Sequence, residues 1–142
     1  MPMRDQHSLG YLLHHTASVY RRVMGSHTKA FDLTPEQFGL LVNLRMKDGI
    51  SQKKLAEQMY KDQATTGKII EKLEAKGLIK RSPDPVDRRA FLLYMTEEAE
   101  RILDQLAPWE ADTRARALRG ISDEELELFE RVIAKMHDNL QD

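Results

Sequence analysis

The sequence contains no cysteine among its 142 residues. This absence excludes a disulfide framework, a thiolate zinc site, a cysteine nucleophile and a thiol redox sensor, and it is typical of a cytoplasmic protein. Glycine-rich phosphate loops, paired metal-ligand motifs and nucleophile elbows are also missing. We therefore expect that the chain is not an enzyme and that it holds no cofactor and no metal.

Long apolar stretches are missing as well. The longest uninterrupted apolar run covers residues 90–95, whereas a membrane-spanning helix needs about 20 residues. The first five residues, Met-Pro-Met-Arg-Asp, contain no apolar signal core. We expect no export and no membrane partner, and the length suits a single domain.

Charge is unevenly distributed, although the net charge is only −1. Residues 51–94 carry ten basic and six acidic groups, a net charge of +4. Residues 95–142 carry six basic and thirteen acidic groups, a net charge of −7. Such segregation can orient a polyanion toward the basic face. An acidic helical surface that only keeps the protein soluble explains the same distribution, so charge alone leaves both interpretations open.

The first 50 residues predict two helices. Apolar residues recur at steps of three and four over residues 8–31, which indicates one long amphipathic helix. Thr34 and Gln37 then form a capping box around Pro35, which suits the first position of a helix. This second helix is expected to end before Gly49.

The basic middle has the pattern of a helix–turn–helix followed by a β-hairpin. Ser51 can cap a short helix, and Asp62 can start a longer helix that Gly77 ends. Two strands, over residues 78–81 and 90–95, flank a turn with two prolines, which predicts a protruding hairpin or "wing". The apolar stripe of the longer helix comprises Thr66, Ile69, Ile70 and Leu73.

The C-terminal third predicts two further amphipathic helices. Thr96 can cap a helix over residues 97–119, which Pro108 should kink or divide. Ser122 opens a last helix whose apolar residues are spaced three and four apart, as in helices that pack on a partner helix. Together with the helix over residues 8–31, these segments predict a dimer across a two-fold axis; a bundle within one chain is the alternative.

The expected fold class is mainly α with a small β-hairpin wing. A winged helix–turn–helix lobe over residues 34–96 is flanked by dimerisation helices over residues 8–31 and 97–140, within one domain of residues 1–142. The helix over residues 62–76 fits the major groove of DNA, which is about 12 Å wide, and a thin hairpin can enter the minor groove.

Side chains suited to DNA lie along this lobe. Lys68 and Lys72 are four residues apart on the polar face of the longer helix, where they can reach guanine or phosphate. Gln63 and Thr65 can present an amide and a hydroxyl group to base edges. Further candidates for DNA contact are Lys53, Lys54, Gly67, Arg88 and Arg89. The glycine allows either close approach of the backbone to DNA or close packing at a crowded crossing, and both remain open.

Several short motifs resemble, in their order and spacing, those of the MarR family of bacterial transcription regulators. The motifs are Leu33–Phe38, Leu55–Glu57, Leu73–Ile79, Asp84–Arg89 and Met95–Glu97. The resemblance extends over about residues 8–140. It implies a homodimer that binds a pseudo-palindromic operator in double-stranded DNA, usually as a repressor released by a small ligand or a redox event. The lack of cysteine rules out thiol oxidation as the releasing event.

The resemblance also implies roles for particular residues. Lys68 and Lys72 occupy the two common basic positions of the recognition helix, and Arg89, next to Arg88, is the wing arginine. Asp62, at the start of this helix, could pair with Arg89 and set the angle of the wing, with Asp87 as a second wing-orienting residue. Thr66 and Gly67 stand where relatives often carry an apolar residue and then threonine or serine, and both are kept as candidates for DNA contact.

The ligand of such regulators often binds between the dimerisation helices and the DNA-binding lobe. For a small lipophilic or phenolic effector, the candidate residues are Tyr11, His14, His15, Phe38 and Trp109. Ordinary core and interface packing explains the same residues. Zinc-sensing relatives carry a His-x-x-x-His pair on the fifth helix, which has no histidine here, so no metal is expected.

A second interpretation of the whole chain is a winged-helix module that binds protein and not DNA. In that case the basic helix would be only a solvated surface. DNA binding predicts a steep loss of affinity with salt, because each phosphate contact releases counterions, whereas a protein-docking module predicts a shallow salt dependence.

Overall fold

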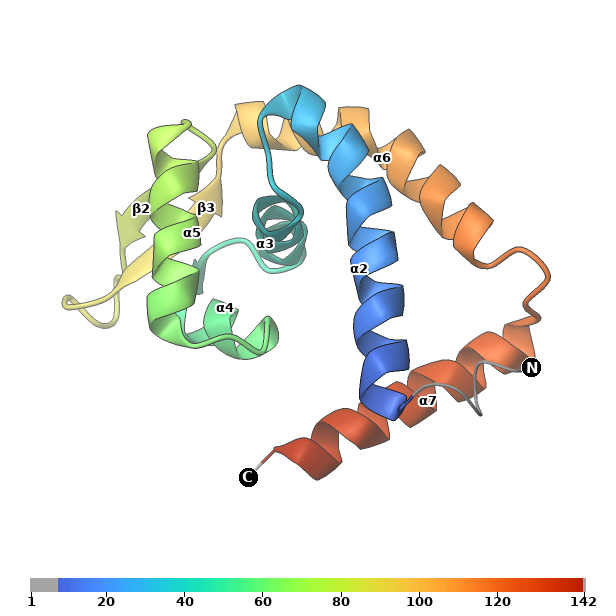
Figure 1. Ribbon diagram of the computed structural model, residues 1–142. Coiled ribbons are helices and arrows are strands. Elements are labelled where there is room, and N and C mark those ends of the chain that lie inside the picture. The colour runs from blue at the N-terminus through green and yellow to red at the C-terminus, as the bar shows by residue number, and fades with distance from the viewer. Residues whose placement is uncertain (1–7, 142) are drawn as a thin grey trace. The chain divides into compact units, whose positions relative to one another are not determined.

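The computed structural model describes residues 8–141 and is mainly helical, with a three-stranded antiparallel sheet (Figure 1). The predicted fold class, mainly α with a hairpin wing, is confirmed. In chain order the elements are α2 (Leu9–Thr28), a 3-10 turn η1 (Lys29–Phe31), α3 (Pro35–Met46), β1 (Ile50–Ser51), α4 (Gln52–Gln58), α5 (Gln63–Ala75), β2 (Ile79–Pro83), β3 (Phe91–Met95), α6 (Glu97–Ala117) and α7 (Asp123–Leu140).

The chain divides into two compact units between Trp109 and Glu110. The first unit holds the hydrophobic core, where helices α3, α4 and α5 pack with strand β3. Its fully buried aliphatic side chains include Leu40, Leu41, Leu44, Leu55, Ile70, Leu73, Leu93 and Leu106. The second unit contains the end of α6 and the whole of α7, and no residue of α7 is buried.

Side-chain caps explain where the helices begin. Thr34, Ser51, Asp62 and Ser122 each accept a hydrogen bond from a backbone N–H three residues further along, as the sequence predicts. Thr34 and Ser122 form complete capping boxes with Gln37 and Glu125. The caps satisfy backbone donors that a helix leaves unpaired, so each boundary is a local property of the sequence.

The sheet is larger than the predicted hairpin. Strand β1 was not predicted; it pairs with β3, with Ile50 opposite Leu93. Two residues are too few to show an alternating pattern, so only the tertiary fold reveals this strand. Strand β2 also runs to Pro83, which the sequence placed in the turn. Proline is tolerated there because β2 lies at the edge of the sheet, whose order is β1-β3-β2.

Two helix predictions also differ from the structure. The first helix ends at Thr28, and a 3-10 turn covers the remaining residues to Phe31. Helix α6 continues through Pro108 and is not divided there. A proline removes one helical hydrogen bond, and burial of Ile102, Leu103 and Leu106 in the preceding turns offsets that loss.

Within residues 8–141, no helix is long and apolar enough to cross a membrane.

Candidate nucleic-acid interface

Helices α4 and α5 pack on one another and are joined by a tight turn (Figure 1). The backbone N–H of Lys61 donates to the carbonyl of Ala56 at 3.0 Å, which closes the end of α4. Tyr60 takes the left-handed conformation in this turn, with φ of 54°. The closed turn sets the direction in which α5 leaves α4, as a helix–turn–helix requires.

The start of α5 is held by Asp62. Its carboxylate accepts hydrogen bonds from the backbone N–H of Thr65 at 2.7 Å and from the Thr65 hydroxyl at 3.2 Å. These hydrogen bonds, led by the backbone one, hold the pKa of Asp62 below its ordinary value, so the carboxylate stays ionised. The predicted pairing of Asp62 with Arg89 is wrong: among the ion pairs of the described residues, Asp62 takes no part, because its carboxylate is committed to the helix cap.

Thr66 faces the interior of the protein and not its surface. Its side chain is fully buried, and its hydroxyl donates to the carbonyl of Asp62 at 2.9 Å. The residue therefore belongs to the inward face of α5, together with Ile70 and Leu73. This corrects its selection as a DNA contact; its place in the apolar stripe of the helix was the better guide.

The other polar candidates on the two helices are exposed. Gln63, Thr65, Lys68 and Lys72 lie on α5, and Lys53 and Lys54 lie in the first turn of α4. None of the four lysines forms an ion pair within the described residues, in contrast to Arg81, which pairs with Glu74 at 2.9 Å. Unpaired, exposed ammonium groups keep their full attraction for an external anion.

The wing turn between β2 and β3 projects away from the helices (Figure 1). Asp84 accepts a hydrogen bond from the N–H of Val86 at 2.9 Å, and Asp87 accepts one from the N–H of Arg89 at 3.0 Å. These side chain to backbone bonds shape the tip locally. Arg88 and Arg89 are exposed and, within the described residues, carry no ion pair. Asp87 thus acts inside the wing turn, where it fixes the backbone that carries Arg89.

Gly67 lies close to the side chain of Gln52 from α4. A Cβ atom at this position would lie 2.9 Å from Nε2 of Gln52, closer than real contacts allow. Of the two explanations that the sequence left open, this contact favours close packing at a crowded crossing. Gln52 was not singled out from the sequence, because nothing local links it to a residue 15 positions further along.

The five candidate effector residues do not gather at one place. Tyr11 stacks on His15, with ring centroids 5.4 Å apart, at the beginning of α2. Trp109 stacks on His27, with ring centroids 4.8 Å apart, and Phe38 is buried in the core. The fifth candidate, His14, is exposed on α2. Core and surface packing thus accounts for most of this set, and His27 is a partner that the sequence did not indicate.

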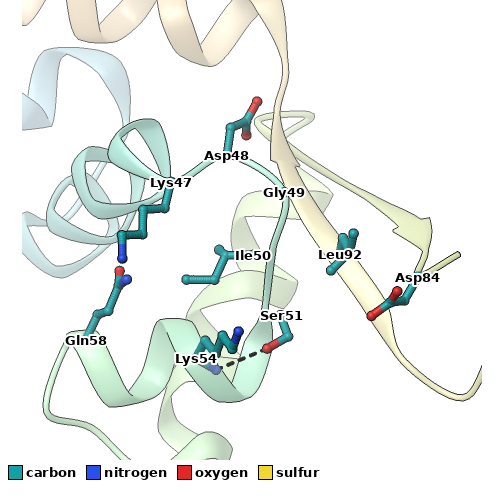
Figure 2. Close-up of a pocket in the computed structure, with 9 residues that line it drawn as sticks. All are labelled: Lys47, Asp48, Gly49, Ile50, Ser51, Lys54, Gln58, Asp84 and Leu92. Carbon is teal, nitrogen blue, oxygen red and sulfur yellow. Dashed lines mark hydrogen bonds between the residues drawn. The ribbon is translucent and has the colours of Figure 1, made fainter. Parts of the chain in front are cut away.

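Two cavities in the first unit are lined by other residues. One, of about 340 Å³, lies where β1 and the start of α4 face the base of the wing (Figure 2). Its lining includes the basic residues Lys47 and Lys54 and the acidic residues Asp48 and Asp84. The other, of about 300 Å³, lies between α2 and the start of α3; it is lined by Ser18, Arg21, Arg22, Gly25 and Pro35. Within residues 8–141, no three histidine or carboxylate side chains gather as metal ligands would.

Comparison with known proteins agrees with this architecture. The model of the MarR family matches residues 33–91, which cover α3 to the start of β3. The chain is 31% identical over 121 residues to the transcriptional regulator HosA of Escherichia coli O111:H-, and the match covers 82% of this chain and 90% of that protein.

Solved structures show the same fold. The Staphylococcus aureus MepR–DNA complex matches with a TM-score of 0.86 and 23% identity, over 94% of this chain and 99% of MepR. A probable transcriptional regulator from Pseudomonas aeruginosa matches with a TM-score of 0.82 and 26% identity, over 92% of this chain and 98% of that chain. The extent of these matches, taken with the identity to HosA, leads to one conclusion: the chain belongs to the MarR family of transcriptional regulators.

Proposed function

We propose that this protein is a homodimeric, cytoplasmic regulator that binds a pseudo-palindromic operator in double-stranded DNA, and that it acts as a repressor released by a small ligand. The observation that carries the proposal is a set of six exposed cations on α4, α5 and the wing tip that form no ion pair with any residue of the described part of the chain: Lys53, Lys54, Lys68, Lys72, Arg88 and Arg89. The chain's membership of a family of transcriptional regulators also gives no reason to propose an enzymatic activity.

The cations divide between two kinds of contact with DNA. Lys68 and Lys72, on the exposed side of α5, reach guanine acceptors or phosphates when this helix enters the major groove. Arg88 and Arg89, on the narrow wing, meet the minor groove, where the potential is most negative in A·T-rich sequences. Two solved relatives, MepR and Escherichia coli MarR, are described as complexes with DNA, which supports this mode of binding.

The terminal helices supply the proposed dimer contact. Helix α2 exposes Leu9, Tyr11, Leu13 and Tyr20, and α7 exposes Leu128, Phe129, Val132 and Leu140. Side chains of this size leave a large apolar area in water, which a second copy of the chain would cover. The proposed organisation is therefore a DNA-binding lobe over residues 34–96 and dimerisation helices over residues 8–31 and 97–140.

Selection of bound fragments from random duplex DNA tests the proposal. We expect the selected consensus to be an inverted repeat with half-site centres about one helical turn apart. Gel shifts with the selected duplex should show a steep fall of affinity with salt, since each phosphate contact contributes a slope of about −0.9. A consensus without two-fold symmetry, or a shallow salt dependence, would instead support a protein-docking module.

A variant without three of these cations sharpens this test. Replacement of Lys68, Lys72 and Arg89 by alanine should abolish most binding to both selected and scrambled duplexes. The matched control replaces Arg114, Arg116 and Lys135, which are exposed cations of the second unit, and should leave binding nearly unchanged. Equal losses in the two triple variants would show that only net charge matters, and would contradict the assigned interface.

A further inference from the structure

Gln52, the first residue of α4, reaches the first turn of α5. Its side-chain Nε2 donates a hydrogen bond to the carbonyl oxygen of Gln63 at 3.1 Å. The Cβ position of Gly67 lies 2.9 Å from the same nitrogen atom. Gly67 follows Gln63 by four residues, so both stand on one side of α5, one turn apart. The amide group of Gln52 therefore occupies the space that any larger residue at position 67 would fill.

Among the glycines inside helices of the described residues, only Gly67 is crowded in this way. Gly39, in the middle of α3, has no atom within 4 Å of its Cβ position, and the nearest atom to that of Gly25 is 3.5 Å away. Glycine inside a helix weakens it relative to alanine, so its presence in α5 calls for a local reason. The Gln52 side chain supplies that reason, because a Cβ atom at position 67 would push its amide nitrogen away from the place where it donates to Gln63.

We propose that Gln52 and Gly67 act as a clip that fixes the start of α5, the proposed recognition helix, against α4. The clip thereby determines which base edges Gln63 and Thr65 can contact. The proposal rests on the proposed DNA-binding function. Gln52 is thus a positioning residue: it acts on the backbone of α5, while the side chains that would read bases belong to the helix it holds.

The clip acts on the turn that carries the base-reading candidates. Asp62 holds the backbone N–H of Thr65, and Gln52 holds the carbonyl of Gln63. Gln63 and Thr65 are exposed in the same turn. A small shift of this turn would misalign their short polar groups with base edges, whereas the long lysine side chains further along can still reach phosphates. Loss of the clip should therefore lower sequence preference much more than overall affinity.

A double-mutant cycle tests the proposal, with the duplex selected by the wild-type protein and a scrambled duplex of equal length as probes. Gln52→Ala and Gly67→Ala should each reduce the ratio of the two affinities about tenfold, the effect of one good base contact. The double variant should be no worse than either single variant, because both changes remove the same hydrogen bond. Gly39→Ala is the matched glycine control and should leave the ratio unchanged.

Three results of the cycle would overturn the proposal. If the affinity ratio of the double variant falls by the product of the two single reductions, Gly67 acts independently of Gln52, for example by allowing the backbone to approach DNA closely. If Gln52→Ala weakens binding to both duplexes equally, Gln52 is only a backbone contact. A ratio unchanged in both single variants would also exclude a positioning role.

Hydrogen exchange of the free protein tests the clip without DNA. In an α-helix the N–H of residue 67 bonds to the carbonyl of residue 63, the acceptor that Gln52 also uses. Both single variants should speed exchange at the start of α5 several-fold, while Gly39→Ala should not. Unchanged exchange in both would contradict the clip. If the wild-type protein selects no DNA at all, the proposed function fails, and the exchange data still decide whether the clip exists.

Discussion

The lobe and the terminal helices of this protein use their apolar residues in opposite ways. In the lobe, Leu41, Leu44 and Leu73 are completely buried, in a core to which several helices and all three strands contribute. In α7 no residue is buried, and Phe129 remains 58% exposed. Because both regions have amphipathic helices, an amphipathic pattern alone does not show whether a helix is covered by its own chain. The proposed dimer accounts for the exposed faces.

The largest expected effect is on the lobe core. Leu44→Ala should lower the free energy of unfolding by about 2–5 kcal/mol, because it removes a fully buried side chain and leaves a cavity. Thermal or urea unfolding monitored by circular dichroism measures it. Met46→Ala, two residues along the same helix but 79% exposed, is the control and should change stability by less than about 0.5 kcal/mol. Equal losses of unfolding free energy in the two variants would show that burial does not distinguish these two positions.

The next largest effect is expected on the apolar face of α7. Phe129→Asp should weaken self-association at least tenfold, because a charge would have to be buried in the proposed dimer contact. Sedimentation equilibrium measures the change, and the melting of the lobe itself should be nearly unaffected. Asn139→Asp adds the same charge at an exposed polar position of α7 and serves as control. A Phe129→Asp protein that associates as strongly as wild type would show that this face does not join two copies.

A smaller effect is expected at the wing. Arg89→Ala should weaken binding to selected and scrambled duplexes alike by several-fold, and should make the salt slope shallower by about 0.9, the share of one phosphate. Lys68→Ala and Thr65→Ala should instead relax sequence preference, by about 1–3 kcal/mol for each hydrogen-bonded base edge that is no longer read. Gel shifts at several salt concentrations separate these outcomes. Unchanged binding by the Arg89 variant would exclude the wing from the interface.

The smallest effect concerns the junction between α2 and the lobe. Arg21 donates from Nε to Glu36 at 2.8 Å, and this hydrogen bond holds the pKa of Glu36 below its ordinary value. A lowered pKa stabilises the folded state above the unfolded pKa, near 4.3, and that contribution is lost as the pH falls through the folded pKa. Because Arg21 is well exposed, Glu36→Gln should cost only about 0–1 kcal/mol at pH 7.

Unfolding as a function of pH measures this contribution. The difference between Glu36→Gln and wild type should shrink as the pH is lowered and vanish once Glu36 is protonated in both the folded and the unfolded state. Arg21→Ala should reproduce the loss, and the double variant should lose little more, since both changes break one ion pair. A difference that persists unchanged at low pH would mean that the carboxylate charge is not the cause.

Local chemistry made much of this protein predictable. Caps such as Thr34 and Ser122 depend on residues three positions apart, and the turn prolines and Gly77 act on their own backbone. The exposed positions of Lys68 and Lys72 follow from helical periodicity, which also placed Thr66 on the buried stripe. The effector candidates stay a prediction; residue type alone did not indicate that Tyr11, Phe38 and Trp109 lie in separate surroundings.

The sequence was enough to predict where most helices begin, that a hairpin follows α5, and which cations the lobe carries, because caps, periodicity and turn chemistry act over a few residues. The three-dimensional structure was needed to find the pairing of β1 with β3, the lack of an ion pair between Asp62 and Arg89 within the described residues, and the contact of Gln52 with Gly67. These depend on groups that meet from separate elements, or on a side chain choosing one of several partners. These contacts depend on packing in three dimensions. One hydrogen bond, or the absence of one methyl group, can stabilise one arrangement over another that the sequence allows equally well.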